Sequence, residues 1–128
     1  MLSACLITAL MLPGTPDANP RQQPSVAVVV SRAGPPLERL AADELAAYLH
    51  RLFDVRVMRA TAVPEDVACA FVVGRRAAGS LPTLSEQGFV IHRAPDAAVP
   101  TVLLAGGSPR ATLWAVYELA ERWGVRHL

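Results

Sequence analysis

Few residues in this sequence have a spacing that could support chemistry, and the glycine pair near its C-terminal end is the most suggestive. Gly106, Gly107 and Ser108 stand where an apolar run gives way to an amphipathic one. The first turn of a helix presents unpaired N–H groups that can bind an anion. However, the lysine of a phosphate-binding loop and the third glycine of a dinucleotide fingerprint are absent. We therefore predict a tight turn before a capped helix and no cofactor.

Acidic side chains occur in two close pairs, but neither pair has the features of a catalytic dyad. Asp43 and Glu44 are adjacent and point apart on a helix, whereas Glu118 and Glu121 share a helical face beside arginines. Nothing around them predicts a pocket that would raise a carboxyl pKa for acid catalysis. The serines lack the context of a nucleophile elbow. We predict no catalytic residue in this chain.

Histidine and cysteine are too scattered to predict a metal site. His50, His92 and His127 occur singly, without ligand spacing to one another or to cysteine. Cys5 and Cys69 are far apart, and two thiols alone cannot complete a zinc site. We expect neither a bound metal nor a disulfide framework.

The charge balance argues against polyanionic partners. The chain has 128 residues with 12 basic side chains, all arginine, against 11 acidic ones. Such a balance creates no strong field for nucleic acid or an anionic membrane. No apolar run reaches the roughly 18 residues that a membrane-spanning helix needs. A single domain of this length can bury a core without disulfides or metals.

Residues 1–24 read as a leader and linker outside the folded domain. The apolar run from Leu6 to Leu12 has the length of a signal-peptide core, although no positive residue precedes it. Residues 13–24 contain four prolines and little to bury. The pattern leans toward a secreted or periplasmic location without fixing it, and we place the domain at residues 25–128.

The remaining chain predicts an α+β domain with two layers. Short apolar or alternating runs indicate strands, and the longer amphipathic runs indicate two helices. A loop with one helical turn is expected at 75–86, and the runs at 88–93 and 101–106 suit an antiparallel hairpin. We expect a mixed sheet of about five strands with both helices packed on one face. The expected strands are 26–30, 55–59, 69–74, 88–93 and 101–106, and the expected helices are 36–53 and 109–123.

Each helix shows a stripe of apolar residues that predicts its buried face. In the last helix, Ser108 suits the N-cap, Pro109 the first turn, and Gly124 the stop. Charged residues of the first helix, including Glu38, are expected mostly on its solvent side. The predicted buried residues are Leu37, Leu40, Ala41, Leu45, Tyr48, Leu49 and Leu52 in the first helix, and Leu113, Val116, Tyr117 and Ala120, with Trp114 beside them, in the last.

The segments "AADELAAYLHRLF", "FVVGR", "EQGFVIHR", "TVLLAGG" and "RATLWAVYELAERWGVRHL" occur in this order. Together they resemble the N-terminal domain of alpha-glucuronidases and the related domain of beta-N-acetylhexosaminidases. The resemblance covers residues 25–128. The last segment is similar to the family's closing helix, although Ala111 stands where the family often has glycine. Gln87 also separates Glu86 from Gly88 in what is usually a Glu-Gly-aromatic turn.

The resemblance implies a zincin-like fold without a zinc site and a non-catalytic role. In that family the catalytic carboxylates belong to a (β/α)8 barrel that follows this domain, so no catalytic residue carries over. The implied partner is that barrel, in the same polypeptide, with a polysaccharide as a further candidate partner. Trp114, Trp123 and Arg126 are the candidate residues for a domain interface or for sugar contact.

Two other functions stay open at this point. A free-standing carbohydrate-binding module would use Trp114 or Trp123 as a stacking surface, although aromatics at these helical spacings are more often core. A small nucleotide-binding domain would need a mainly parallel sheet, with Gly106 and Gly107 facing a pocket.

Overall fold

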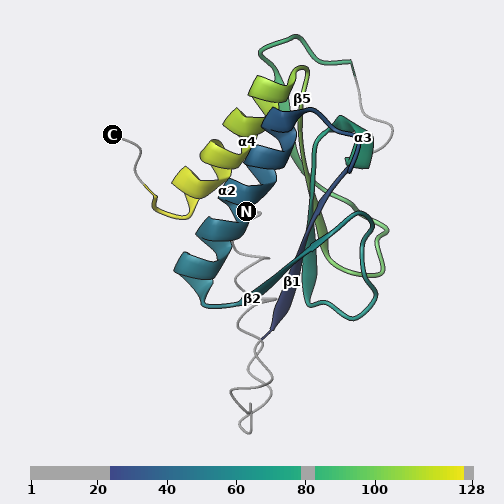
Figure 1. Ribbon diagram of the computed structural model, residues 1–128, viewed down its shortest axis with the longest axis vertical. Coiled ribbons are helices and arrows are strands. Elements are labelled where there is room, and N and C mark those ends of the chain that lie inside the picture. The colour runs from purple at the N-terminus through teal and green to yellow at the C-terminus, as the bar shows by residue number, and fades with distance from the viewer. Residues whose placement is uncertain (1–23, 79–82, 126–128) are drawn as a thin grey trace, which may run out of the picture.

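Five strands form one mixed sheet in the order β2-β1-β3-β5-β4. The computed structural model describes residues 24–78 and 83–125 (Figure 1). Neighbouring strands pair in parallel, except that β4 runs antiparallel to β5 at one edge. The predicted five-stranded mixed sheet is confirmed, including the antiparallel pairing of the last two strands. The strands are β1 (Ser25–Val30), β2 (Arg56–Ala60), β3 (Cys69–Val73), β4 (Phe89–Arg93) and β5 (Thr101–Gly106).

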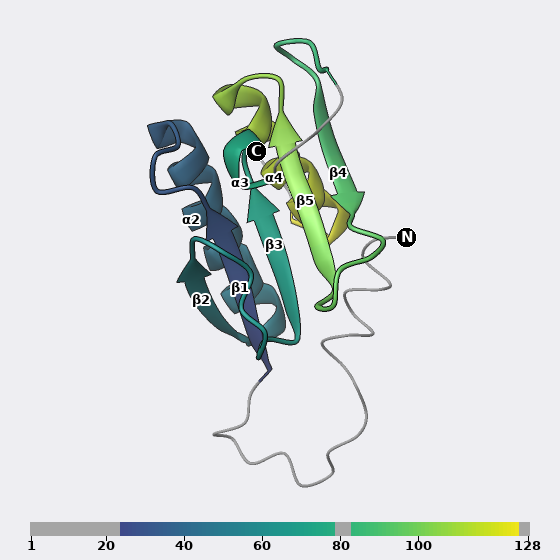
Figure 2. The same cartoon turned by 90° about the vertical axis from the view of Figure 1, so that its right-hand side faces the viewer.

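Two long helices cover one face of the sheet, as predicted. In Figure 1, α2 (Pro36–Phe53) and α4 (Pro109–Arg122) lie side by side on the same side of the strands. The single turn α3 (Arg75–Ala78) lies on the opposite side, and Figure 2 shows the strands in front of the long helices. The helix α2 connects the parallel strands β1 and β2, which is the crossover arrangement expected from their order.

The interior strands are buried on both faces because they lie between the long helices and the loops of the other side. Val26, Val28, Phe71 and Val73 point into the helix-side core and are each fully buried. Their neighbours along β1 and β3 contribute to a second, smaller cluster on the other face, with partly buried side chains from α3 and β5. A near-continuous β-branched sequence suits such strands, since both sides of the pleat must be apolar.

The ends of α4 follow the signals in its sequence. The Ser108 hydroxyl accepts a hydrogen bond from the Ala111 N–H at 3.1 Å and so caps the first turn. Beyond Trp123, Gly124 adopts a φ of +100°, the left-handed conformation that ends many helices. The predicted N-cap and stop are therefore confirmed.

The predicted buried faces of the helices were partly wrong. In α2, Leu37, Leu40 and Leu52 are 37%, 43% and 39% exposed, whereas Glu38, expected on the solvent side, is only 5% exposed. In α4 the buried face is shifted toward smaller residues. Its buried members are Ala111, Thr112, Ala115, Val116, Leu119 and Ala120, while Leu113 and Tyr117 are half-buried. The reason is the close packing of α2 against α4, which favours small side chains between them.

In the described ranges, no helix has the length and apolar character needed to cross a bilayer. The predicted leader lies outside the described residues apart from Pro24, so residues 1–24 stay a sequence prediction.

The central position of Phe71 gives a test of this core. Phe71 lies on the middle strand of the sheet and is fully buried. Its ring packs edge-on against Trp123, with the ring centroids 5.9 Å apart. Phe71→Ala should lower the free energy of unfolding by about 3–5 kcal/mol, because it removes a fully buried ring and leaves a cavity. Leu40→Ala, at a site 43% exposed, is the control and should change it by about 0.5 kcal/mol or less. Urea denaturation measures both, and equal losses would contradict the described core.

Candidate functional site

The glycine turn after β5 uses its N–H groups within the protein. The Gly106 N–H donates to the Thr112 hydroxyl at 2.9 Å, and the Gly107 N–H donates to the Gly88 carbonyl at 2.8 Å. The Ala111 N–H donates to the hydroxyl of Ser108, the N-cap residue. These donors are therefore not directed at a ligand, in agreement with the predicted tight turn.

Close packing explains why both positions are glycine. A Cβ at Gly106 would come within 2.5 Å of the Ala111 backbone in α4. A Cβ at Gly107 would overlap the carbonyl of Ser85. A nucleotide-binding domain needs these glycines to face a pocket, and here they face protein backbone. The sheet meets the other requirement of that hypothesis, since four of its five strands are parallel.

The two tryptophans have different surroundings. Trp123 packs edge-on against Phe53 and Phe71, with ring centroids 5.1 and 5.9 Å apart, and its indole N–H is buried without a hydrogen bond to the described part of the chain. Trp114 is 40% exposed on α4. Of the two, Trp114 has the accessible ring that a partner or a sugar could contact. The third candidate, Arg126, lies outside the described residues.

Leu37 and Leu40 near the start of α2 and Trp114 of α4 are exposed apolar side chains, and we call this set of three the apolar ridge. Tyr117 of α4 lies close enough to Glu44 of α2 for the glutamate charge, after burial, to raise the tyrosine pKa. Leu37 and Leu40 precede Glu44 by about two turns and one turn of α2, and Trp114 precedes Tyr117 by almost one turn of α4.

A buried carboxylate that the sequence analysis missed lies where β1 and β3 end. Glu38 is 5% exposed, and its carboxylate packs against Gly34 and Gly74. A Cβ at Gly74 would lie 2.5 Å from Glu38 Oε2, and one at Gly34 would lie 2.9 Å from it. The helical periodicity of the sequence predicted that Glu38 would be exposed with the other charged residues. Gly34 and Gly74 are 40 residues apart, so the sequence did not indicate that both would contact its carboxylate. The glycines make the space that this carboxylate fills.

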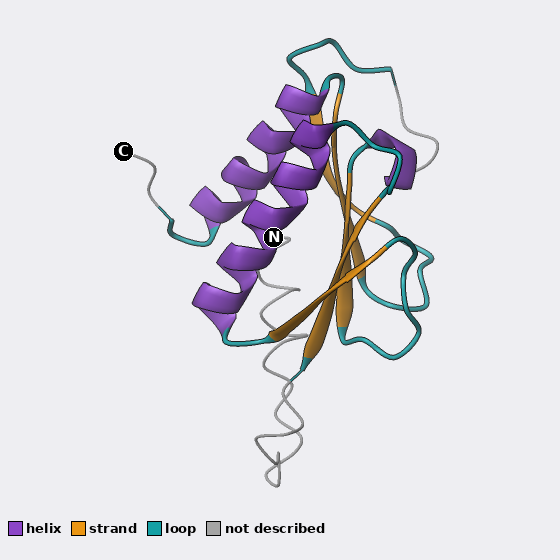
Figure 3. Ribbon diagram, in the orientation of Figure 1, coloured by secondary structure: helices purple, strands orange, loops and turns teal. Residues whose placement is uncertain are grey.

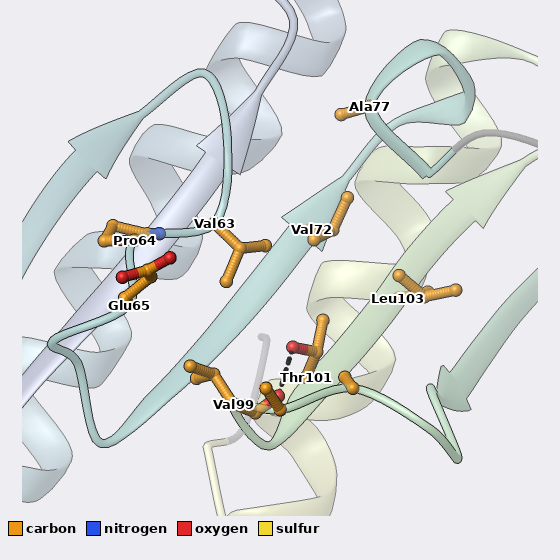
Figure 4. A pocket seen from close by; sticks show the side chains of 10 residues that line it. Val63, Pro64, Glu65, Val72, Ala77, Val99, Thr101 and Leu103 are labelled. Atoms are coloured by element: carbon orange, nitrogen blue, oxygen red, sulfur yellow. Dashed lines mark hydrogen bonds between the residues drawn. The ribbon is translucent and has the colours of Figure 1, made fainter.

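An apolar hollow of about 400 Å³ lies on the face of the sheet away from the long helices (Figure 4). Val63, Val72 and Leu103 point toward it from a loop and two strands. The Thr101 hydroxyl donates to the Val99 carbonyl at 2.7 Å, so the polar group at its base is already bonded. With Glu65 as the one charged side chain of its lining, the hollow has no pair of groups for acid–base chemistry.

Several other polar groups are engaged in structural contacts. Glu118 pairs with Arg122 at 3.4 Å one turn along α4, and Asp43 pairs with Arg59. Burial raises the pKa of the Cys69 thiol to about 12, which keeps it protonated and unreactive at neutral pH. Within residues 24–78 and 83–125, no three His, Cys, Asp or Glu side chains lie together as metal ligands would.

Comparison with known proteins gives a structural likeness. No protein-family model and no curated protein matches the sequence. A solved structure does match, that of "a novel family GH115 4-O-Methyl-alpha-glucuronidase, BtGH115A, with specificity for decorated arabinogalactans". The TM-score is 0.64 at 19% identity, over 80% of this chain and 14% of the other. The two proteins share a fold. This chain therefore spans about one-seventh of the length of the glycoside hydrolase that it resembles.

The buried Glu38 carboxylate makes Gly74 a sensitive position. Gly74 has a φ of +94°, so Gly74→Ala adds backbone strain of roughly 1–2 kcal/mol and also places a methyl group against Glu38. Gly124→Ala is a matched control, because Gly124 has a φ of +100° but nothing within 4 Å of its added Cβ. We expect Gly74→Ala to lower the free energy of unfolding by clearly more than Gly124→Ala in urea denaturation.

A double-mutant cycle isolates the contact. In a Glu38→Ala background the steric part of the Gly74→Ala loss should disappear and the strain part should remain. Equal losses in both backgrounds would show that the carboxylate does not fill this space.

Proposed function

We propose that this chain is a non-catalytic domain of a carbohydrate-active glycoside hydrolase of the alpha-glucuronidase type. The observation that supports this most is the shared fold with a GH115 alpha-glucuronidase over 80% of this chain but only 14% of the larger one. In this proposal residues 25–128 form the domain. It packs on a catalytic (β/α)8 barrel that lies elsewhere in the same polypeptide.

The chemistry of the described residues supports a non-catalytic role. Most glycosidases use two carboxyl groups on either side of the scissile bond, one of them an acid with a raised pKa. Here Asp43 and Glu118 each pair with an arginine on the surface, and Glu38 is enclosed by Gly34 and Gly74. None of these carboxylates faces a second one across a cleft that a sugar could enter.

The apolar ridge is the surface that we assign to packing on the barrel. Its three side chains are each 37–43% exposed, and large apolar groups clustered on one surface are typical of sites where another protein packs. Trp114 is the natural anchor, because tryptophan contributes more buried area at an interface than any other side chain.

Activity measurements test the catalytic part of the proposal. The purified 128-residue protein should not hydrolyse glucuronoxylan or aryl glycosides. A longer protein that includes the coding sequence after Leu128 should hydrolyse one of them, and should lose that activity when a barrel carboxylate is replaced. Turnover by the 128-residue protein that disappears on replacing one of its own acidic residues would overturn the proposal. So would a stop codon directly after Leu128.

A second candidate is a free-standing carbohydrate-binding module, which the exposure of Trp114 favours. Sugar rings stack on accessible aromatic faces, and the Trp114 ring is 40% exposed while Trp123 lies within an aromatic cluster.

Tryptophan fluorescence separates the two candidates. If Trp114 binds sugar, titration with xylan, chitin or glucuronic acid oligomers should change the emission, and Trp114→Ala should abolish the change. Met58→Ala, at a similarly exposed apolar residue of the edge strand β2, should leave it intact. No response to any of these sugars would exclude the binding-module candidate and leave Trp114 to the domain interface.

A further inference from the structure

A second, larger hollow of about 820 Å³ lies at the edge of the sheet where β1 and β2 end. Ser31 and Arg32 line it just after β1, and residues 61–64 line it just after β2. Because the two strands are parallel, their carboxyl ends meet at one edge, as the arrowheads in Figure 2 show. Ligands of open α/β sheets bind outside the carboxyl ends of the strands, and the hollow lies at that edge next to β1.

Three arginines line this hollow and come from three different elements. Arg32 follows β1, Arg39 lies at the end of the first turn of α2, and Arg59 lies near the end of β2. No carboxylate is among its lining residues, all of which the structure describes. We call this group of three side chains the arginine hollow. In a chain with 12 basic and 11 acidic side chains, it is a local concentration of positive charge.

Two of the three guanidinium groups are held in place but keep free donors. Arg39 Nη1 donates to the Gly34 carbonyl at 3.2 Å, and Arg59 pairs with Asp43 at the rim. A guanidinium carries five N–H donors, so each contact leaves others available. Side chains that are already ordered lose less entropy when they bind a ligand. The Asp43 carboxylate is 64% exposed and offsets one positive charge of three.

The remaining lining suits a small ring that carries the anion. Val30, Ala60, Val63 and Pro64 supply apolar surface, and the hydroxyl groups of Ser31 and Thr61 supply further polar contacts. Planar guanidinium groups bind carboxylates through paired N–H donors. A sugar acid presents both features, a ring with C–H faces and a carboxylate at its edge.

We propose that the arginine hollow binds the carboxylate of a uronic acid, with Arg32 and the free donors of Arg39 and Arg59 as its ligands. The choice of a uronic acid rests on the proposed function, whereas the charge and position of the hollow do not. The hollow is formed by the strand ends and the start of α2, and none of the three residues of the apolar ridge is among its lining residues.

Titration of the 128-residue protein with sodium glucuronate tests the proposal, with chemical shifts of backbone amides as the measurement. We expect saturable shifts at Arg32 and Thr61 at low ionic strength, and weaker binding as sodium chloride screens the arginines. Arg32→Gln should weaken binding by about threefold or more, the scale of one exposed ion pair. Arg32 is exposed, so this variant should unfold at the same temperature as the parent.

Two further variants sharpen the test. Asp43→Asn should tighten glucuronate binding, because it removes the carboxylate that competes for Arg59. Arg122→Gln is the matched control, since Arg122 forms a similar surface pair with Glu118 outside the hollow, and it should leave affinity unchanged. Equal effects of Arg32→Gln and Arg122→Gln, weaker binding by Asp43→Asn, or no saturation would overturn the proposal.

Three other ligands establish what is recognised. Glucose should not bind, and acetate and inorganic phosphate should each bind more weakly than glucuronate, because none of them combines the ring with a carboxylate. Binding of phosphate or acetate as tight as that of glucuronate would overturn the assignment of a uronic acid. The proposed hydrolase domain is tested by the activity of the longer protein, so the two ideas fail separately.

Discussion

The close approach of α2 and α4 is the constraint on which the rest of this structure depends. Both helices pack on the same face of the sheet and against each other (Figure 3). Small residues favour such close packing, and Ala41, Ala42, Ala111, Ala115 and Ala120 of the two helices are all fully buried. Several larger side chains of the same helices lie at the surface instead. Leu37, Leu40 and Trp114 lie on the outside, where they form the apolar ridge.

The sequence predicted the positions of the helices and strands well, but it predicted less well which side of each helix is buried. Strands β1 and β3 were predictable because β-branched runs bounded by proline or glycine favour extended structure, and α4 because Ser108 and Gly124 mark its ends. The periodicity of apolar residues shows that a helix has one buried side. Which residues lie at the middle of that side depends on how closely the next helix packs. That distance is a tertiary property, so the exposure of Leu40 and the burial of Glu38 were not predictable.

The candidate sites also differ in how far the sequence could predict them. The tight turn at Gly106 was predictable because Ser108 and Pro109 mark the start of the helix that follows it, although its bond to the Gly88 carbonyl comes from a loop distant in sequence. The arginine hollow was not, because Arg32, Arg39 and Arg59 meet only when α2 brings β2 back alongside β1. Of the candidate aromatic residues, the sequence could not separate Trp114 from Trp123, since both occur on the same amphipathic stretch and differ only in the neighbours that the fold supplies.

The two outer strands limit how this domain can associate with others. An unpaired strand edge invites another strand to add to the sheet, and charged side chains along the edge oppose this. Here β2 presents Arg56 and Arg59, and β4 presents His92 and Arg93, all of them exposed. Lateral growth of the sheet is disfavoured on both borders. We therefore expect partners to pack on the layers of the domain and not to extend its sheet at either edge strand.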